Sequence, residues 1–122
     1  MIKKMEIIGI HTEVNDDLRK YVTRKIGHLD KYIPRKARES AHAEVRLKDL
    51  GTKKKNQYMC EVTLHLPHEN ISTQETTLNI FAAVDIVETK LKNQLKKYKE
   101  KHSVLRGHTR RVISKIRSPR TE

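Results

Sequence analysis

The chain contains two stretches in which apolar residues recur at steps of three and four, the spacing of a helix that buries one face. In the second stretch, residues 79–102, the apolar positions share one narrow face of a helix with about 3.6 residues per turn. These positions are Ile80, Val84, Val87, Leu91, Leu95 and Tyr98. The pattern predicts a long amphipathic helix in the last third of the chain.

The other amphipathic stretch begins after Asn15, a residue type that favours the helix N-cap. The helix is expected to end before Pro34, because the residue preceding a proline disfavours helical geometry. Gly27 then lies inside the helix. The buried face is expected to carry Leu18, Val22, Ile26 and Leu29.

Four segments have the composition or alternation of β-strands. Residues 4–10 are rich in isoleucine, and residues 40–50 and 58–66 alternate between apolar and mostly polar positions. Residues 71–78 form a weaker, mostly polar segment. The inward positions of the two alternating segments are Ala41, Ala43, Val45, Leu47, Tyr58, Cys60, Val62, Leu64 and Leu66. Such alternation predicts half-buried antiparallel strands with one face towards a core.

The resulting order is β-α-β-β-β-α, which predicts an α+β fold. Each strand offers one apolar face and each helix one apolar stripe, so the economical arrangement is a four-stranded sheet with two helices packed on one face. A right-handed crossover through the first helix would make the first two strands parallel. The polar faces of the two helices would then point outward together, as a charged surface rather than a cleft.

The charge of the chain is one-sided. Its 122 residues include 27 Lys and Arg against 15 Asp and Glu, a formal net charge of +12. From Lys90 to Lys101, six lysines accompany a single glutamate. Like charges so close together repel one another, so the pattern indicates a polyanionic partner, and nucleic acid is the first candidate. On the first helix, the face opposite the apolar stripe carries Lys20, Arg24, His28 and Lys31.

The remaining bulk features concern compartment and domain organisation. A single cysteine, Cys60, excludes an intrachain disulfide and fits a reducing compartment. No apolar run approaches the length of a bilayer span, and the N-terminal one is too short for a secretory signal, so we expect a cytoplasmic protein without membrane contact. We expect an α+β domain at residues 1–102 and a basic, flexible tail at residues 103–122. Three arginines of the tail are candidate phosphate contacts, namely Arg106, Arg110 and Arg111.

The two helical stretches carry a family resemblance. "TEVNDDLRKYVTRKIGHLDKY" at residues 12–32 and "NIFAAVDIVETKLKNQLKKYKEKH" at residues 79–102 resemble the two helices of the ribosome hibernation-promoting factor and ribosome-associated inhibitor family. The resemblance implies binding to the small ribosomal subunit and its rRNA at the decoding region, where mRNA and tRNA would lie, and silencing of translation in stressed or resting cells. It also implies a short family form that lacks the dimerisation domain of the long members, and we expect a monomer off the ribosome. The positions that match the family's rRNA-facing residues are Lys25, Lys31, Lys90, Lys97, Lys99 and Lys101.

Two other functions remain open for a basic α+β domain. One is a general double-stranded RNA-binding module not restricted to the ribosome, and the other is an adaptor for an acidic protein. An enzyme is not expected, because the chain has no Gly-rich phosphate loop or nucleophile elbow. No cofactor, metal or small-molecule substrate is expected either. His65, with Cys60 and His68 nearby, could suggest zinc, but the alternation directs Cys60 and His65 to opposite faces of their strand.

Overall fold

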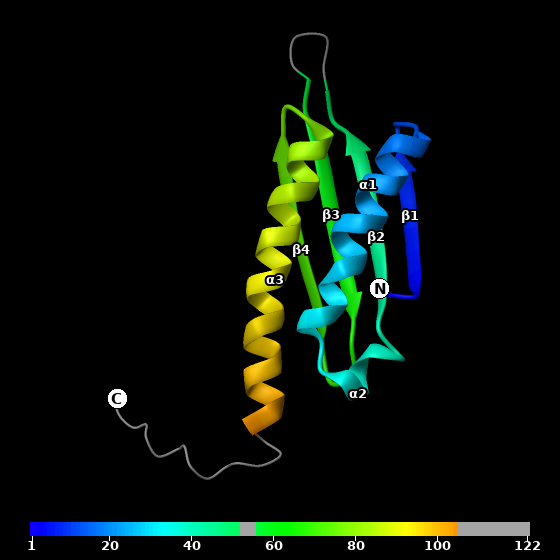
Figure 1. Cartoon of the computed structure of the whole chain (residues 1–122). Helices are drawn as coiled ribbons and strands as arrows, with labels where there is room; N and C mark the ends of the chain where they lie inside the picture. The colour runs from blue at the N-terminus through cyan, green and yellow to red at the C-terminus, as the bar shows by residue number, and fades with distance from the viewer. Residues whose placement is uncertain (52–55, 105–122) are drawn as a thin grey trace, which may run out of the picture.

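The computed structural model describes residues 1–51 and 56–104, and Figure 1 shows a four-stranded sheet covered on one face by helices. The elements in chain order are β1 (Lys4–Ile10), α1 (Asp16–Gly27), the 3-10 helix η1 (His28–Tyr32), α2 (Arg35–Arg38), β2 (His42–Asp49), β3 (Tyr58–His65), β4 (Asn70–Thr77) and α3 (Ile80–Val104). This order confirms the α+β fold predicted from the sequence.

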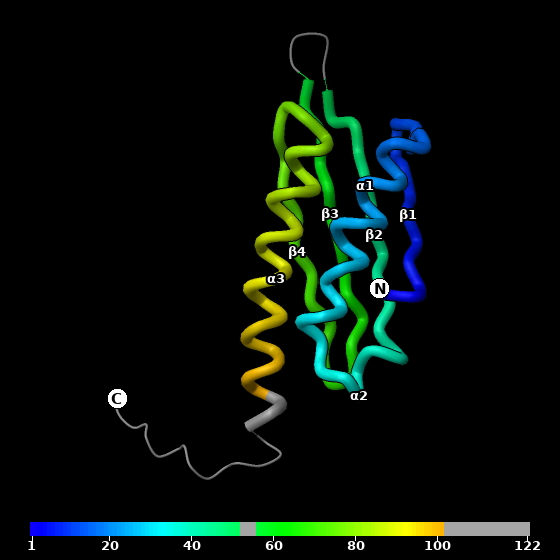
Figure 2. Tube along the Cα trace, viewed as in Figure 1, coloured from blue at the N-terminus to red at the C-terminus, as the bar shows by residue number. Residues whose placement is uncertain are grey.

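The strands follow one another in the sheet in the order β1-β2-β3-β4. β1 pairs with β2 in parallel, and the other neighbouring strands are antiparallel. The connection through α1 explains the parallel pair, because a parallel neighbour needs a crossover that returns the chain to the same end of the sheet. In Figures 1 and 2, α1 crosses in front of β2 while α3 runs beside β4, both on the same side of the sheet. The opposite face of the sheet is covered by none of the described elements.

The helix that follows Asn15 begins as expected and ends earlier than expected. The Asn15 side chain accepts a hydrogen bond from the Leu18 amide at 2.8 Å. At the other end, α1 stops at Gly27 and the chain continues as η1. The Ile2 amide donates to the Gly27 carbonyl at 3.0 Å, and a Cβ at Gly27 would lie 3.2 Å from the side chain of Met1. Gly27 is therefore a helix end approached closely by the N-terminal segment, rather than a mid-helix residue.

The core lies between the sheet and the helices, at the inward positions predicted for β2 and β3. The side chains there that have no exposed surface are Ala43, Val45, Leu47, Cys60, Val62 and Leu64. The apolar faces of α1 and η1 close the core from above, with Val22 and Ile26 fully buried and Leu29 almost so. The alternation in the strands thus identified the buried face of the sheet correctly.

The long helix α3 buries its predicted stripe and extends past residue 102. Its fully buried side chains include Val84, Val87, Leu91 and Leu95. Tyr98 is also buried, and its hydroxyl donates a hydrogen bond to the Pro67 carbonyl at 2.7 Å, which satisfies its one polar atom. Within residues 1–51 and 56–104, no helix is long and apolar enough to cross a membrane.

The short helix α2 is absent from the sequence prediction. It follows Pro34 and joins η1 to β2. The guanidinium Nε of Arg38 donates to the carbonyl oxygens of Asp30 and Ile33, both at 2.9 Å, and so ties α2 back to η1. A helix of 4 residues shows no helical period in the sequence, which is why the hydrophobic pattern could not indicate it.

Candidate nucleic-acid interface

The lysines of α3 lie in two rows, one on each flank of the helix. On the flank towards β4, the Lys90 ammonium lies 2.5 Å from a carboxylate oxygen of Glu75, and the Lys101 ammonium lies 3.3 Å from one of Glu69. Lys97 and Lys101 both line a hollow against β4. We call Lys90, Lys97 and Lys101 the edge row. Two of its three charges are thus partly offset by strand carboxylates.

On the other flank, α3 and the α1–η1 segment enclose a groove. The hollow between them has a volume of about 330 Å³. Its lining residues are Arg24, Lys25, His28, Leu29, Lys31, Tyr32, Glu88 and Lys92. Four cationic side chains and one carboxylate therefore line what we call the inter-helix groove. The expectation of a charged surface without a cleft is wrong, because a hollow lies between α3 and the α1–η1 segment.

Two tyrosine rings contact the cations in and beside this groove. The Arg24 guanidinium lies 5.3 Å and the Lys25 ammonium 5.6 Å from the ring centre of Tyr21. Around the ring of Tyr32, the ammonium groups of three lysines lie at 5.3 to 6.0 Å, namely Lys31, Lys92 and Lys96. A cation within about 6 Å of an aromatic face is attracted by the ring quadrupole, which positions positive charge without neutralising it.

The groove is braced by a contact between its two walls. The Tyr21 hydroxyl donates to the Asp85 carboxylate at 2.5 Å, and the Lys25 ammonium lies 3.4 Å from the same oxygen. The hydrogen bond to Asp85 raises the pKa of Tyr21, so the phenol stays protonated and remains a donor. The Tyr21 ring also meets Phe81 edge to face, with centroids 5.1 Å apart. These contacts fix α1 relative to α3 and therefore fix the spacing of the cations.

The structure divides the residues predicted from the sequence into separate groups. Arg24, Lys25, His28 and Lys31 line the inter-helix groove, and the edge row lies on the far flank of α3. Lys20 is exposed on α1, and Lys99 is exposed on the same flank of α3 as Lys92, since seven residues make almost two turns. Arg106, Arg110 and Arg111 lie outside the described residues.

Sequence reasoning missed four residues in or beside the groove, namely Lys92 and Tyr32 in its lining and Lys96 and Tyr21 beside it. The spacing of residues 92, 96 and 99 does place them on one flank of the helix. The pattern could not say on which flank α1 packs, because both flanks of α3 are equally rich in lysine.

The open face of the sheet, unlike the inter-helix groove, carries balanced charge. By strand register, it carries three cationic and three anionic side chains within the paired parts of β1, β2 and β3. They are Lys4, Arg46, Lys48, Glu6, Glu44 and Glu61. Arg46 lies 3.4 Å from Glu44 and 3.5 Å from Glu61, so these charges pair with one another. Among the described residues, the unbalanced positive charge therefore lies away from the open sheet face.

Residues 5–103 match the family described as Sigma 54 modulation protein / S30EA ribosomal protein. The chain belongs to this family. The ribosome hibernation promotion factor of Lactococcus lactis is 34% identical over 96 residues, which make up 79% of this chain and 49% of that protein. The Staphylococcus aureus factor of the same name is 29% identical over 96 residues, 79% of this chain and 48% of that protein. The chain thus spans about half the length of these relatives.

Solved structures share the fold. The N-terminal domain of Thermus thermophilus Protein Y is similar with a TM-score of 0.66 at 27% identity. The match covers 76% of this chain and 94% of the Protein Y domain. A ribosomal subunit interface protein from Coxiella burnetii has a TM-score of 0.64 at 21% identity, with 80% of this chain and 98% of its own covered. The α+β fold and the family resemblance of the two helical motifs are both confirmed.

Proposed function

We propose that this protein silences translation by binding the small ribosomal subunit with its helical face towards rRNA. In this proposal the two helices occupy the path of mRNA and tRNA at the decoding region, in stressed or resting cells, and no covalent bond is made or broken. The observation that carries the proposal is the contrast between the two faces. The four cations that line the inter-helix groove outnumber the two carboxylates beside them, Glu88 in the lining and Asp85 next to Lys25, whereas the charges of the open sheet face are balanced.

The chemistry of the groove suits a phosphate backbone. Lysine and arginine bind phosphates largely without regard to sequence, and their binding releases counterions. Structured RNA presents its phosphates and 2′-hydroxyls at fixed spacing, so a rigid array of cations can dock by shape and charge. The Tyr21–Asp85 hydrogen bond makes the array rigid before binding.

The family supports the choice of RNA. The matched relatives from Lactococcus lactis and Staphylococcus aureus are named ribosome hibernation promotion factors. We propose that the groove cations, the edge row and the predicted tail arginines together form the rRNA-facing set. Lys20 and Lys99 extend this set along α1 and α3.

Cosedimentation in sucrose gradients tests the proposal. Purified protein is expected to travel with small subunits at one copy per subunit in the presence of excess naked RNA duplex. Subunits loaded beforehand with mRNA and initiator tRNA are expected to capture much less protein. If the duplex removes the protein from subunits, a general double-stranded RNA-binding module is the better description. Equal capture by loaded and empty subunits would contradict occlusion of the decoding region.

A further inference from the structure

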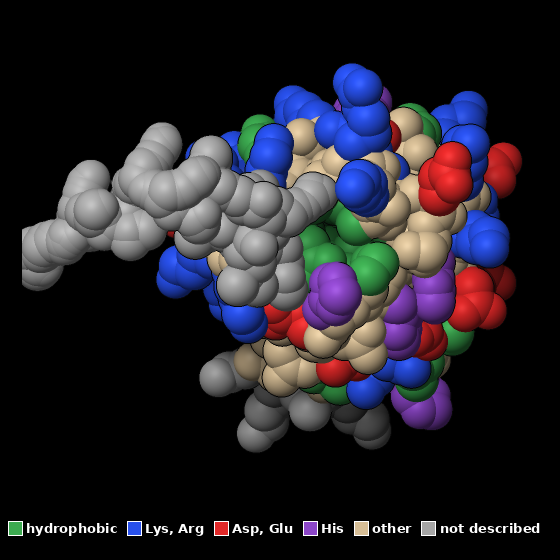
Figure 3. Space-filling model, turned by 90° about the horizontal axis from the view of Figure 1, so that it is seen from below, with side chains coloured by type: hydrophobic (Ala, Val, Ile, Leu, Met, Phe, Trp, Pro, Cys, Tyr) green, Lys and Arg blue, Asp and Glu red, His purple; other side chains and the backbone are tan. Residues whose placement is uncertain are grey.

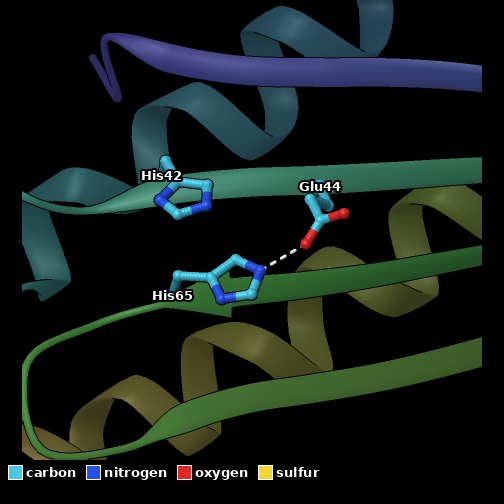
Figure 4. Close-up of side chains that lie close together, drawn as sticks. All are labelled: His42, Glu44 and His65. Carbon is cyan, nitrogen blue, oxygen red and sulfur yellow. Dashed lines mark hydrogen bonds and ion pairs between the residues drawn. The ribbon is translucent and has the colours of Figure 1, made fainter.

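The open face of the sheet holds a cluster that the proposed function does not use. Figure 3, which views the molecule from below, shows histidine side chains at the surface of this end. In Figure 4, His42 and Glu44 project from β2 and His65 from β3, all towards the same side of the sheet. We propose that these three side chains form a binding site for a divalent transition metal, with zinc as the ion.

The backbone brings the three residues together. His42 pairs directly with His65 across β2 and β3. Glu44 lies two positions further along β2 and therefore on the same face. One ligand atom from each residue can be chosen such that all three lie within 4.8 Å of one another. Zinc bonds of about 2.0–2.2 Å in a tetrahedron require ligand atoms roughly 3.3 Å apart, so binding requires the side chains to rotate and bring these atoms closer together.

The three side chains already contact one another without a metal, although the stacked histidine rings must rotate before both can face one ion. The His42 and His65 rings stack with centroids 4.2 Å apart and planes at 11°. His65 Nε2 is hydrogen-bonded to Glu44 Oε1, and a metal would take the place of the proton between them. The other carboxylate oxygen, Glu44 Oε2, lies 3.4 Å from Arg46, which also contacts Glu61. Arg46 thus orients the carboxylate from behind, as outer partners of metal ligands commonly do.

The donor set selects the class of metal. Two imidazole nitrogens and one carboxylate oxygen suit zinc and its neighbours in the transition series, and they do not suit calcium or magnesium. The side chains of His65 and Glu44 are 28% and 24% exposed, so the site is open to solvent. A fourth position therefore remains for water or for a ligand from another molecule, and binding is expected to be weaker than at a closed four-ligand site.

A bound zinc ion would cross-link β2 and β3 on the face away from the groove. Metal that binds the folded chain alone raises its apparent stability with the logarithm of metal concentration. Because the site and the inter-helix groove lie on opposite faces, zinc is not expected to change small-subunit capture. The inference therefore stands whether or not the proposed function is correct.

Titration calorimetry of the whole chain with zinc chloride tests the site. The wild type is expected to bind one equivalent, and His42→Gln and His65→Gln are each expected to weaken binding more than about tenfold, since loss of even an outer partner typically costs 10–100-fold. His28→Gln is the matched control, because His28 is exposed in the groove. It is expected to bind zinc like the wild type. Equal binding by all three variants, or no saturable binding by the wild type, would overturn the proposal.

A measurement on the wild type alone guards against variants that fail to fold. Cobalt(II) in a four-coordinate site gives intense visible absorption bands, whereas cobalt(II) bound loosely with six waters and oxygens gives weak ones. Addition of cobalt chloride is expected to produce the intense bands, and zinc is expected to abolish them. Weak bands only would mean that these histidines bind metal adventitiously, and the proposal would fall.

Discussion

Removal of the two α3 lysines that lie against Tyr32 gives the most quantitative test of the proposed RNA-binding face. The ammonium groups of Lys92 and Lys96 lie 6.0 Å and 5.9 Å from the ring centre of Tyr32. Neither touches the buried stripe of α3, so replacing both by glutamine should leave the fold intact. Each phosphate contact contributes about 0.7–0.9 to the slope of log affinity against log salt. The double variant is therefore expected to have a slope shallower by roughly 1.5 if both lysines meet phosphates.

The slope of log affinity against log salt can be measured by titrating labelled protein with small subunits at several salt concentrations. A slope difference of roughly 1.5 means that raising the salt from about 50 to about 200 mM weakens the variant about eightfold less than the wild type. Lys4→Gln with Lys48→Gln is the matched control, because it removes the same charge from the open sheet face. Its slope should equal that of the wild type. Equal slopes for all three proteins would refute the assignment of these lysines to phosphate contacts.

Three further predictions concern the fold. Leu91→Ala should destabilise the domain by about 2–5 kcal/mol in urea unfolding, because Leu91 is fully buried. Leu78→Ala, at a residue 72% exposed, should change the stability little, and equal stabilities of the two variants would mean that the α3 stripe is not part of the core. Burial raises the pKa of the Cys60 thiol to about 12, so a thiol reagent at about pH 8 should label it only after unfolding, and rapid labelling of the native protein would contradict its placement. The hydrogen bond from the Met1 ammonium lowers the pKa of Asp30 below its ordinary value of 3.8. The ion pair therefore stabilises the folded chain above pH 3.8, and this stabilisation is lost as the pH falls through the lower pKa that Asp30 has in the folded chain. Asp30→Asn should therefore lose less thermal stability than the wild type between about pH 6 and pH 3, and an identical loss would show that the pair does not contribute.

The sequence was sufficient for the elements whose burial has a regular period. Val45 and Val62 alternate with polar neighbours, so their strands could face only one way without exposing the apolar set. The stripe of α3 and the N-cap at Asn15 were equally readable, because both depend on residues close together in the chain. Element order then restricted the fold to a sheet with helices on one face.

The arrangement of the charges could not be read in the same way. The lysines of α3 are spread over both of its flanks, and only the packing of α1 decides that Lys92 and Lys96 meet Tyr32 while Lys90 meets Glu75. That choice depends on contacts between residues far apart in sequence. Helical periodicity contains no information about it.

The histidine cluster shows the same limit on the other face. Cys60 and His68 are the possible metal ligands nearest to His65 in the sequence, and the alternation of β3 correctly places Cys60 on the opposite face of the strand. The true neighbours come from β2, and they follow from the register that pairs His42 with His65. Register is fixed by the whole sheet, so the cluster emerges only when β2 and β3 are placed side by side.

The measurement that tests the central claim most directly compares two charge-reversed variants in cosedimentation with small ribosomal subunits. One variant, the groove variant, carries Arg24→Glu, Lys92→Glu and Lys96→Glu in and beside the inter-helix groove. The other carries Lys3→Glu, Lys4→Glu and Lys48→Glu, away from the groove. Both lose the same net charge, so non-specific attraction falls equally. With both variants folded by circular dichroism, the groove variant is expected to stay at the top of the gradient and the other to travel with the subunits. If the two variants are captured equally, the helical face is not the surface that binds the ribosome.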